Sequence, residues 1–325
     1  MRVTENTNFE TIRNSIARTK GKMEGLQMQS ATLKKLNTPS DDPISASKVL
    51  EMRTDKVNND QFQMNAKMAS TFLENSDHAL SELAEIVVRA KEIALGQSSG
   101  ASANEDTRLG VAEEVTQLYL QSVAIANRRI GERFLFGGYK VNKPPVDPDG
   151  KYVGDDGQMM VEIAKDVFLS GNIPGVEAFN TNPKAAKAEM QGYDGSGTRG
   201  PASEGDGDPI NQRENVNVFD EIQNLRISLL SGDTDGIRNT LDRLEDMHSK
   251  LIATRTKVGS RLQGLQTTEQ ALDRHNVTNA QLSSALEDAD MAQVVSDLAK
   301  EETVFRSALS SAHKLIQPTL LDFLK

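Results

Sequence analysis

Four histidines are the side chains of this sequence best suited to bind a transition metal or to move protons. They are His78, His248, His275 and His313, and none has a partner at metal-ligand spacing. Two acidic runs, at Asp147 and Asp206, begin like calcium-binding loops. Gln158 and Asn217 stand where the glutamate at the twelfth position is needed. We therefore predict solvated turns at both runs and no metal site.

One string, Gly195–Gly200, matches the G-x-G-x-x-G pattern of dinucleotide-binding loops. No apolar strand precedes it, and Pro201 and Gly205 follow where the phosphate-binding helix should begin. The sequence has no G-x-S-x-G nucleophile elbow, and its carboxylate pairs fall on predicted helix surfaces. We therefore predict no cofactor and no enzyme activity. A hydrolase within residues 138–210 is the enzymatic alternative, and a substrate screen of that region would test it.

The composition favours long helices over a large β core. Of the 325 residues, 37% are hydrophobic and only 4% aromatic, with no tryptophan and no cysteine, and the net charge is −10. This charge disfavours nucleic-acid binding, and no apolar run approaches the roughly 18 residues of a membrane span. The N-terminus lacks the apolar core of a secretory signal. By themselves, these features favour a cytosolic protein without nucleic-acid or membrane partners.

One proline-free stretch, residues 210–317, contains the main elements that would position a functional side chain. Its apolar residues recur alternately three and four apart, which predicts a long helix packed along other helices, from about Thr234 to Leu286. The ladder is Ile237, Leu241, Leu244, Leu251, Val258, Leu262, Leu265, Leu272 and Leu286. Two more helices, from Pro43 to about Gly96 and from about Asn104 to Phe134, are expected to face it. The predicted fold is mainly α, a long antiparallel helical bundle.

Each end of the chain carries a weaker ladder of its own. Residues 1–37 hold seven basic and three acidic side chains, a net of +4, and the last 39 residues hold four and seven, a net of −3. These charges predict that the terminal helices pair with each other or with neighbouring copies; two ordinary surface helices are the alternative. The ladders are Phe9, Ile12, Ile16, Met23, Leu26 and Leu33, then Met291, Val295, Leu298, Phe305, Leu309 and Ile316.

A joint is predicted beside each terminal helix. In the first joint Pro39, Asp41, Asp42 and Pro43 end one helix and start the next, with Asp42 as N-cap and Pro43 as the first helical residue. In the second joint, Leu286 and Met291 are five residues apart, whereas the apolar residues of the ladder are three or four apart. Asp288 and Asp290 lie in this gap, where they would cap a new helix.

Residues 138–210 differ in composition from the rest of the chain. With Gly137 they hold 13 of the 23 glycines, and they hold seven of the ten prolines. Residues 152–153 and 159–163 read as the strands of a β-hairpin. We expect a small β-rich domain, inserted between helices and facing solvent. The expected parts are 1–43 (assembly helix and joint), 44–137 (rod), 138–210 (insertion), 211–286 (rod) and 287–325 (assembly helix).

Four segments carry a resemblance to a known family. ALEDADMAQVVSDLAKEETVFRSALSSAHKLIQPTLLDFL resembles the C-terminus of the flagellar hook-associated protein 3 family, the hook–filament junction proteins. LNTPSDDPISAS, ANRRIGERFLFGG and KVGSRLQGL are similar to other shared segments of that family. The resemblance covers residues 1–137 and 211–325. Phe305-Arg306 departs from the more glutamine- and alanine-rich stretch expected there.

The resemblance implies an axial structural protein that is exported without a cleaved signal and assembled outside the cell, contrary to the cytosolic expectation. It implies that the terminal helices mediate assembly, including Leu320, Leu321 and Phe323 in the tail. The implied partners are hook-associated protein 1, flagellin, further copies in a ring, and an export chaperone at the C-terminal segment. The alternatives are a flagellin, against which the tail from Gln317 to Lys325 argues, and a signalling coiled coil, which would need a membrane anchor.

Overall fold

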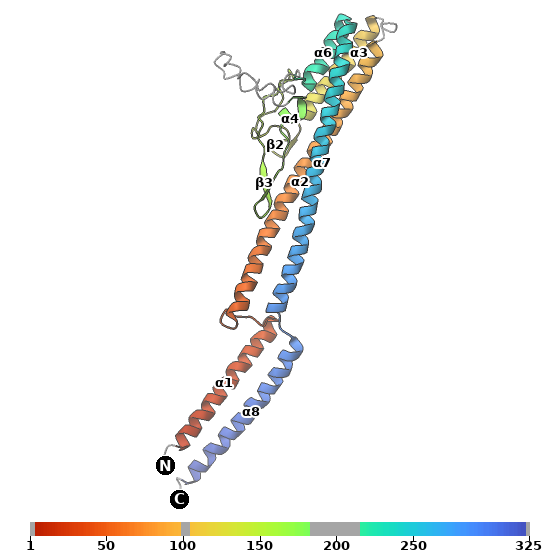
Figure 1. Cartoon of the computed structure of the whole chain (residues 1–325). Helices are drawn as coiled ribbons and strands as arrows, with labels where there is room; N and C mark the ends of the chain where they lie inside the picture. The colour runs from red at the N-terminus through yellow and green to blue at the C-terminus, as the bar shows by residue number, and fades with distance from the viewer. Residues whose placement is uncertain (1–3, 99–104, 183–214, 323–325) are drawn as a thin grey trace, which may run out of the picture. The chain divides into compact units, whose positions relative to one another are not determined.

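The computed structural model describes residues 4–98, 105–182 and 215–322 of the chain. Two helices make up much of it: α2 (Pro43–Ser98) has 56 residues and α7 (Thr234–Glu287) has 54 (Figure 1). α7 begins at the predicted residue and ends one residue beyond the predicted end. The prediction of a mainly α fold built on a long helical bundle is confirmed.

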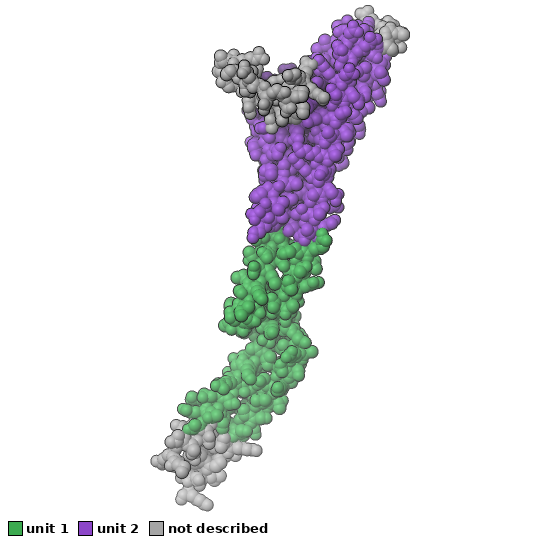
Figure 2. Space-filling model, viewed as in Figure 1, with its two compact units in different colours: residues 1–59, 273–325 green, residues 60–272 purple. Residues whose placement is uncertain are grey.

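The chain divides into two compact units (Figure 2). Unit 1 comprises residues 1–59 and 273–325, and unit 2 comprises residues 60–272. The long helices α2 and α7 contribute residues to both units. Unit 2 contains most of the buried apolar side chains among the described residues.

Unit 2 contains the hydrophobic core. Here α2 and α7 lie side by side, and the three-and-four spacing of their apolar residues places a continuous stripe of each against the other. α3 (Glu105–Ala126) and α6 (Val218–Ser231) pack together beside them. The buried stripes include Leu73, Leu80 and Val87 of α2 and Leu244, Leu251, Val258 and Leu265 of α7.

α3 is shorter than predicted. It ends at Ala126 rather than near Phe134, and the next residues form a two-stranded turn of β1 (Arg129–Ile130) and β2 (Arg133–Phe134). The side-chain amide of Asn127 explains the end of the helix. It donates to the Val146 carbonyl (2.8 Å) and accepts from the Val146 amide (3.0 Å), so the chain is tied to a distant loop instead of continuing as helix.

The predicted β-hairpin is half right. The segment predicted at 159–163 is strand β3 (Met160–Ala164), but its partner is the downstream β4 (Val167–Ser170), and residues 152–153 are not its second strand. Tyr152 instead forms an isolated bridge with Val146 and is buried. Its hydroxyl lies 2.7 Å from the Phe136 carbonyl oxygen, so the residue serves as a core side chain rather than as a hairpin strand.

An aromatic cluster joins residues from the predicted insertion to the helical core. Phe179, in the short helix α4 (Gly175–Phe179), is fully buried, with its ring centroid 5.0 Å from that of Phe136 and 5.2 Å from that of Phe219. Both contacts are edge-to-face, the favoured geometry for aromatic pairs. At least this part of residues 138–210 belongs to the core of unit 2.

Glu221 on α6 is a buried carboxylate in this core, and it makes unit 2 sensitive to pH. Its Oε1 accepts from Arg243 (3.2 Å) and Asn224 (3.3 Å), but burial outweighs these contacts and raises the pKa of its carboxyl. A raised folded-state pKa means that wild-type stability falls as the pH rises from the ordinary glutamate value through the folded one. Glu221→Gln has no carboxyl to ionise at this position, so its stability does not fall in this way.

We expect the free energy of unfolding of Glu221→Gln, relative to that of the wild type, to increase between pH 4.5 and pH 7.5. Urea unfolding of both proteins at the two pH values measures the change. A difference that stays constant, or shrinks toward neutral pH, would contradict the assignment of Glu221 as a desolvated acid.

Unit 1 holds the two terminal helices, α1 (Thr4–Thr32) and α8 (Met291–Asp322), which lie side by side as an antiparallel pair (Figure 1). On α1 the predicted ladder faces the pair. On α8 the ladder residues Met291, Leu298 and Phe305 also face the pair. Val294 takes the place predicted for Val295, which is exposed, and Leu309 is exposed as well. The partly or fully buried seam residues are Ile12, Ile16, Thr19, Met23, Leu26, Met291, Val294, Leu298 and Phe305.

Leu33 is not part of the α1 ladder. α1 ends at Thr32, and Leu33 has a left-handed backbone (φ 60°) and an exposed side chain. The side chains of Phe9, Ile316, Leu320, Leu321 and Phe323 lie outside the described residues, as do Gly195–Gly200 and the run at Asp206.

Candidate functional site

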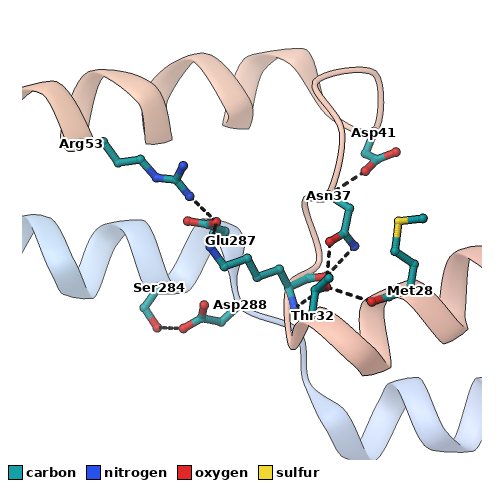
Figure 3. A network of polar contacts seen from close by, with 9 residues as sticks. Met28, Thr32, Asn37, Asp41, Arg53, Ser284, Glu287 and Asp288 are labelled. Carbon is teal, nitrogen blue, oxygen red and sulfur yellow. Dashed lines mark hydrogen bonds and ion pairs between the residues drawn. The ribbon is translucent and has the colours of Figure 1, made fainter.

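The two predicted joints come together in unit 1 (Figure 3). The end of α1, the start of α2, the end of α7 and the start of α8 meet there. Residues after α1 and α7 form a short antiparallel bridge, Lys34 with Asp288, in which the Lys35 amide donates to the Glu287 carbonyl (2.6 Å) and the Ala289 amide donates to the Leu33 carbonyl (3.0 Å). The left-handed conformation of Leu33 turns the chain out of α1 and into this bridge.

A tight turn then leads from the bridge to α2. The Asp41 amide donates to the Thr38 carbonyl (3.0 Å), which closes a β-turn with Pro39 at its preferred second position. The Asp41 carboxylate accepts from the Thr38 amide (2.8 Å), the Thr38 hydroxyl (2.8 Å) and the Asn37 amide (3.0 Å). These bonds, those from Thr38 first, hold the pKa of the Asp41 carboxyl below its usual value.

Asp42 and Asp290 begin the two helices that leave the joint. Asp42 Oδ1 accepts from the amides of Ile44 (3.1 Å) and Ser45 (3.2 Å), and α2 starts at Pro43, as predicted. Asp290 Oδ1 accepts from the amides of Ala292 (2.9 Å) and Gln293 (3.3 Å) at the start of α8. The hydroxyl of Ser45 is the main cause of a lowered pKa at the Asp42 carboxyl.

Glu287 is the buried centre of the joint. Only 8% of the residue is exposed, and its Oε1 accepts from Lys34 Nζ (2.5 Å) and from Arg53 Nη2 (2.5 Å). Burial alone raises the pKa of its carboxyl, but the two hydrogen bonds and the two positive charges together hold that pKa below its usual value. One ionised carboxylate therefore links the segment after α1 to the first turns of α2 and the last residue of α7.

Several known proteins are similar to this chain in sequence or in fold. Residues 3–140 match the family of the bacterial flagellin N-terminal helical region. The chain is 22% identical over 293 residues to flagellar hook-associated protein 3 of Escherichia coli K12, covering 86% of each chain. The fold matches flagellar hook-associated protein 3 from Legionella pneumophila (TM-score 0.59, 17% identity, 73% of this chain and 98% of that one). It also matches FlgL from Bacillus cereus (TM-score 0.54, 17% identity, 72% and 99%).

In sequence and in fold, the chain resembles the flagellar hook-associated proteins, and its residues 3–140 resemble the helical region of flagellin. Its predicted resemblance to hook-associated protein 3 is confirmed, and the relatives support a structural role and a location in the bacterial flagellum. None of the helices among the described residues is long and apolar enough to cross a membrane.

Three residues of the joint are not identified by the sequence patterns: Lys34, Arg53 and Glu287. Glu287 is separated from its two partners by 253 and 234 residues. A single sequence offers many charges of either sign, and nothing in it pairs residues at such separations. The one available signal was the position of Glu287 within the gap between the two C-terminal ladders.

The arrangement does not resemble a catalytic or metal centre. Within residues 4–98, 105–182 and 215–322, no group of three histidine or acidic side chains could hold a metal ion. An open groove of about 550 Å³ lies beside Glu287, lined by Lys34, Arg53, Lys56, Asp288 and smaller side chains. Its charges of both signs sit among helix ends, which suits a structural joint between helices.

Apolar burial in unit 1 is inverted relative to unit 2. Among its described residues, only Val49 and Val294 are buried apolar side chains, while ten large apolar side chains are exposed; unit 2 buries 37 and exposes 14. Even the α2–α7 contact is polar here, since the buried Asn59 donates to His275 (2.9 Å) and Asn276 (3.0 Å). Exposed apolar side chains that gather on one surface are typical of a binding interface.

The joint leads to a prediction about filament retention. Glu287→Gln keeps the shape of the side chain but removes the charge that Lys34 and Arg53 share, so we expect bacteria carrying it to shed filaments more readily under shear. Both cations are solvent-accessible, so the loss within one subunit is about 1 kcal/mol or less, repeated in every copy. Glu302→Gln, at an exposed position of α8, is the control and should retain filaments normally.

The same variant has a defined pH dependence. Because the folded-state pKa of Glu287 is lowered, its contribution is present above the ordinary glutamate value and is lost only as the pH falls through the folded value, below 4.5. The difference in shedding between wild type and Glu287→Gln should therefore be equal at pH 7 and pH 5. Equal shedding by the two strains at pH 7 would refute the role given to Glu287.

Proposed function

We propose that this chain is a structural axial protein of the bacterial flagellum, an adaptor that joins the hook, through hook-associated protein 1, to the flagellin filament. The observation that carries the proposal is the inverted burial of unit 1, whose described residues include two buried apolar side chains and ten large exposed ones. A subunit that works alone would bury such side chains. One that is buried between other subunits needs them at its surface.

The terminal helices are the proposed assembly elements. α1 and α8 pair through a narrow seam, and Val295 and Leu309 of α8 remain exposed beside it, available to further copies in a ring. Helices with so little apolar burial are marginal by themselves, since most helical stability in proteins comes from packing. They therefore order fully when subunits assemble, a property that suits export of an unfolded chain through a narrow channel.

Export supplies the remaining proposed partner. We place the assembled protein outside the cell, at the hook–filament junction, after export without a cleaved signal peptide. A cytosolic export chaperone would bind the C-terminal segment, where apolar side chains such as Leu298 and Phe305 are only partly buried. The adaptor has no catalytic step. Its activity is the mechanical connection of two helical lattices.

A second candidate is a flagellin that forms the filament itself, which the match of residues 3–140 to the flagellin N-terminal region favours. The tail from Gln317 to Lys325, which resembles hook-associated protein 3, argues for the adaptor. The two candidates differ in copy number: a junction protein forms a short zone, whereas a flagellin forms the whole filament.

Electron microscopy of a deletion strain tests the proposal. We expect hooks that lack filaments, with flagellin lost to the medium, and restoration of filaments by the wild-type gene. Immunogold labelling of the complemented strain should mark only the base of each filament. Labelling along the filament would favour the flagellin candidate, and normal filaments on the deletion strain would refute the adaptor.

A further inference from the structure

α2 has a second face in unit 1 that no part of the described chain covers. Its seam with α7 uses Val49 and Asn59, both buried. On another side of the same helix, Ser47, Leu50, Thr54 and Val57 follow one another at helical spacing, and all four are uncharged and exposed. Leu50 is 65% exposed and Val57 is 67% exposed. Apolar side chains seven residues apart on one face are the pattern of a helix–helix seam.

α7 carries a matching stripe at the same end of the unit. Thr278, Leu282 and Ala285 recur at spacings of four and three, and they are uncharged and exposed, with Leu282 49% exposed. At 3.6 residues per turn they lie away from the seam positions Asn276 and Ser283. The turn angles place this stripe and the α2 stripe on opposite outer sides of the α2–α7 pair.

The hydroxyl groups of both stripes are already satisfied within their own helices. Ser47 Oγ donates to the Ile44 carbonyl (2.8 Å), Thr54 Oγ1 donates to the Leu50 carbonyl (2.9 Å), and Thr278 Oγ1 donates to the Arg274 carbonyl (3.0 Å). These side chains therefore present their carbon atoms outward. Both stripes can be buried against another helix without leaving a polar group unpaired.

The stripes also lie at the same height along the helix pair. α2 and α7 run antiparallel, and the bond from Asn59 to Asn276 (3.0 Å) sets their register. Counting from it puts Val57 level with Thr278, Thr54 about level with Leu282, and Leu50 level with Ala285. At each level, a larger side chain of one stripe corresponds to a smaller side chain of the other: Leu50 to Ala285, Leu282 to Thr54, and Val57 to Thr278. The two stripes therefore complement each other in size.

We propose that the α2 stripe of one copy packs against the α7 stripe of the next copy. The partner must come from outside the chain's described helices, because in unit 1 α1 already pairs with α8 and α2 with α7. Because the two stripes differ, the contact runs head to tail and repeats around a ring, instead of closing as a two-fold dimer. This inference rests on the proposed function, since only an assembly of many copies holds so small a contact together.

Cysteine crosslinking tests the contact, and the chain has no native cysteine to interfere. Flagella from cells carrying Val57→Cys with Thr278→Cys in one chain should, after oxidation, give a ladder of covalent multimers. Each single variant should give monomers. The matched control pairs Val57→Cys with Val277→Cys, which lies at the same height but on another side of α7, and should give no ladder. A mixture of the two single-cysteine chains should give dimers only.

Each other outcome counts against the contact. Dimers from Val57→Cys alone would show a two-fold interface, and monomers from both the double variant and the mixture, in motile cells, would refute the contact while leaving the adaptor intact. A thiol-to-amine crosslink from Val57→Cys to a different flagellar protein, identified by mass, would assign the α2 stripe to that partner. Absence of the wild-type chain from flagella would refute the adaptor, and the ring contact with it.

Discussion

Phe179→Ala is expected to lower the free energy of unfolding of the free chain by about 3–5 kcal/mol, the usual cost of removing a fully buried aromatic side chain. Phe179 lies edge-to-face against both Phe136 and Phe219, so its loss leaves a cavity bordered by α4, α6 and the segment after β2. For a unit of this size, the melting temperature should fall on the order of 10 °C. Differential scanning calorimetry of the two proteins measures the change.

Phe168→Ala is the matched control, because Phe168 lies exposed on β4 within the same predicted insertion. It should change the melting temperature by no more than about 2 °C. An insertion that only decorated the surface would tolerate both substitutions equally. Equal, small effects would show that residues around Phe179 fold apart from the helical core.

Leu298→Ala is expected to leave the melting temperature of the free chain nearly unchanged and to abolish or strongly weaken filament attachment. Leu298 is only partly buried, in the α1–α8 seam of a unit whose described residues include two buried apolar side chains, so the free chain gains little from it. In the assembled junction the same side chain would be enclosed. Leu309→Ala, at an exposed position of α8, should act in the same direction.

Leu244→Ala is the counterpart in unit 2 and should do the reverse. Leu244 is fully buried on α7, and its truncation should cost about 2–5 kcal/mol in the free chain. Leu262→Ala, at a partly buried position, should cost less. Thermal unfolding and a motility assay on the same four variants measure both effects. Similar melting-temperature losses for Leu298→Ala and Leu244→Ala would show that α8 is stably packed within one subunit.

The long-range helical pattern was predictable because it depends only on local spacing. The ladder from Ile237 to Leu286 predicted α7 within one residue, and the five-residue slip before Met291 predicted the start of α8. The cap at Asp42 was predictable for the same reason, since an aspartate before a proline satisfies the first amides of a helix without help from distant residues.

The errors arose where tertiary contacts decide between two locally acceptable choices. Val294 and Val295 are adjacent valines, and only the position of α1 determines which one enters the seam. The end of α3 depends on a bond between Asn127 and Val146, and the partner of β3 depends on where Tyr152 is buried. At the joint, the local caps were found, but the ion pairs of Glu287 were not, because the chain distance between partners carries no sequence signal.

Amide hydrogen exchange tests most directly the claim that unit 1 acquires its full burial only on assembly. The account predicts that, in the free chain, α1, α8 and the joint exchange far faster than the α7 residues between Leu244 and Leu265, whose exchange requires opening of the core. In isolated flagella, the same unit 1 amides should become protected. Protection of α1 and α8 in the free chain equal to that of the α7 core, with no further change in flagella, would contradict it.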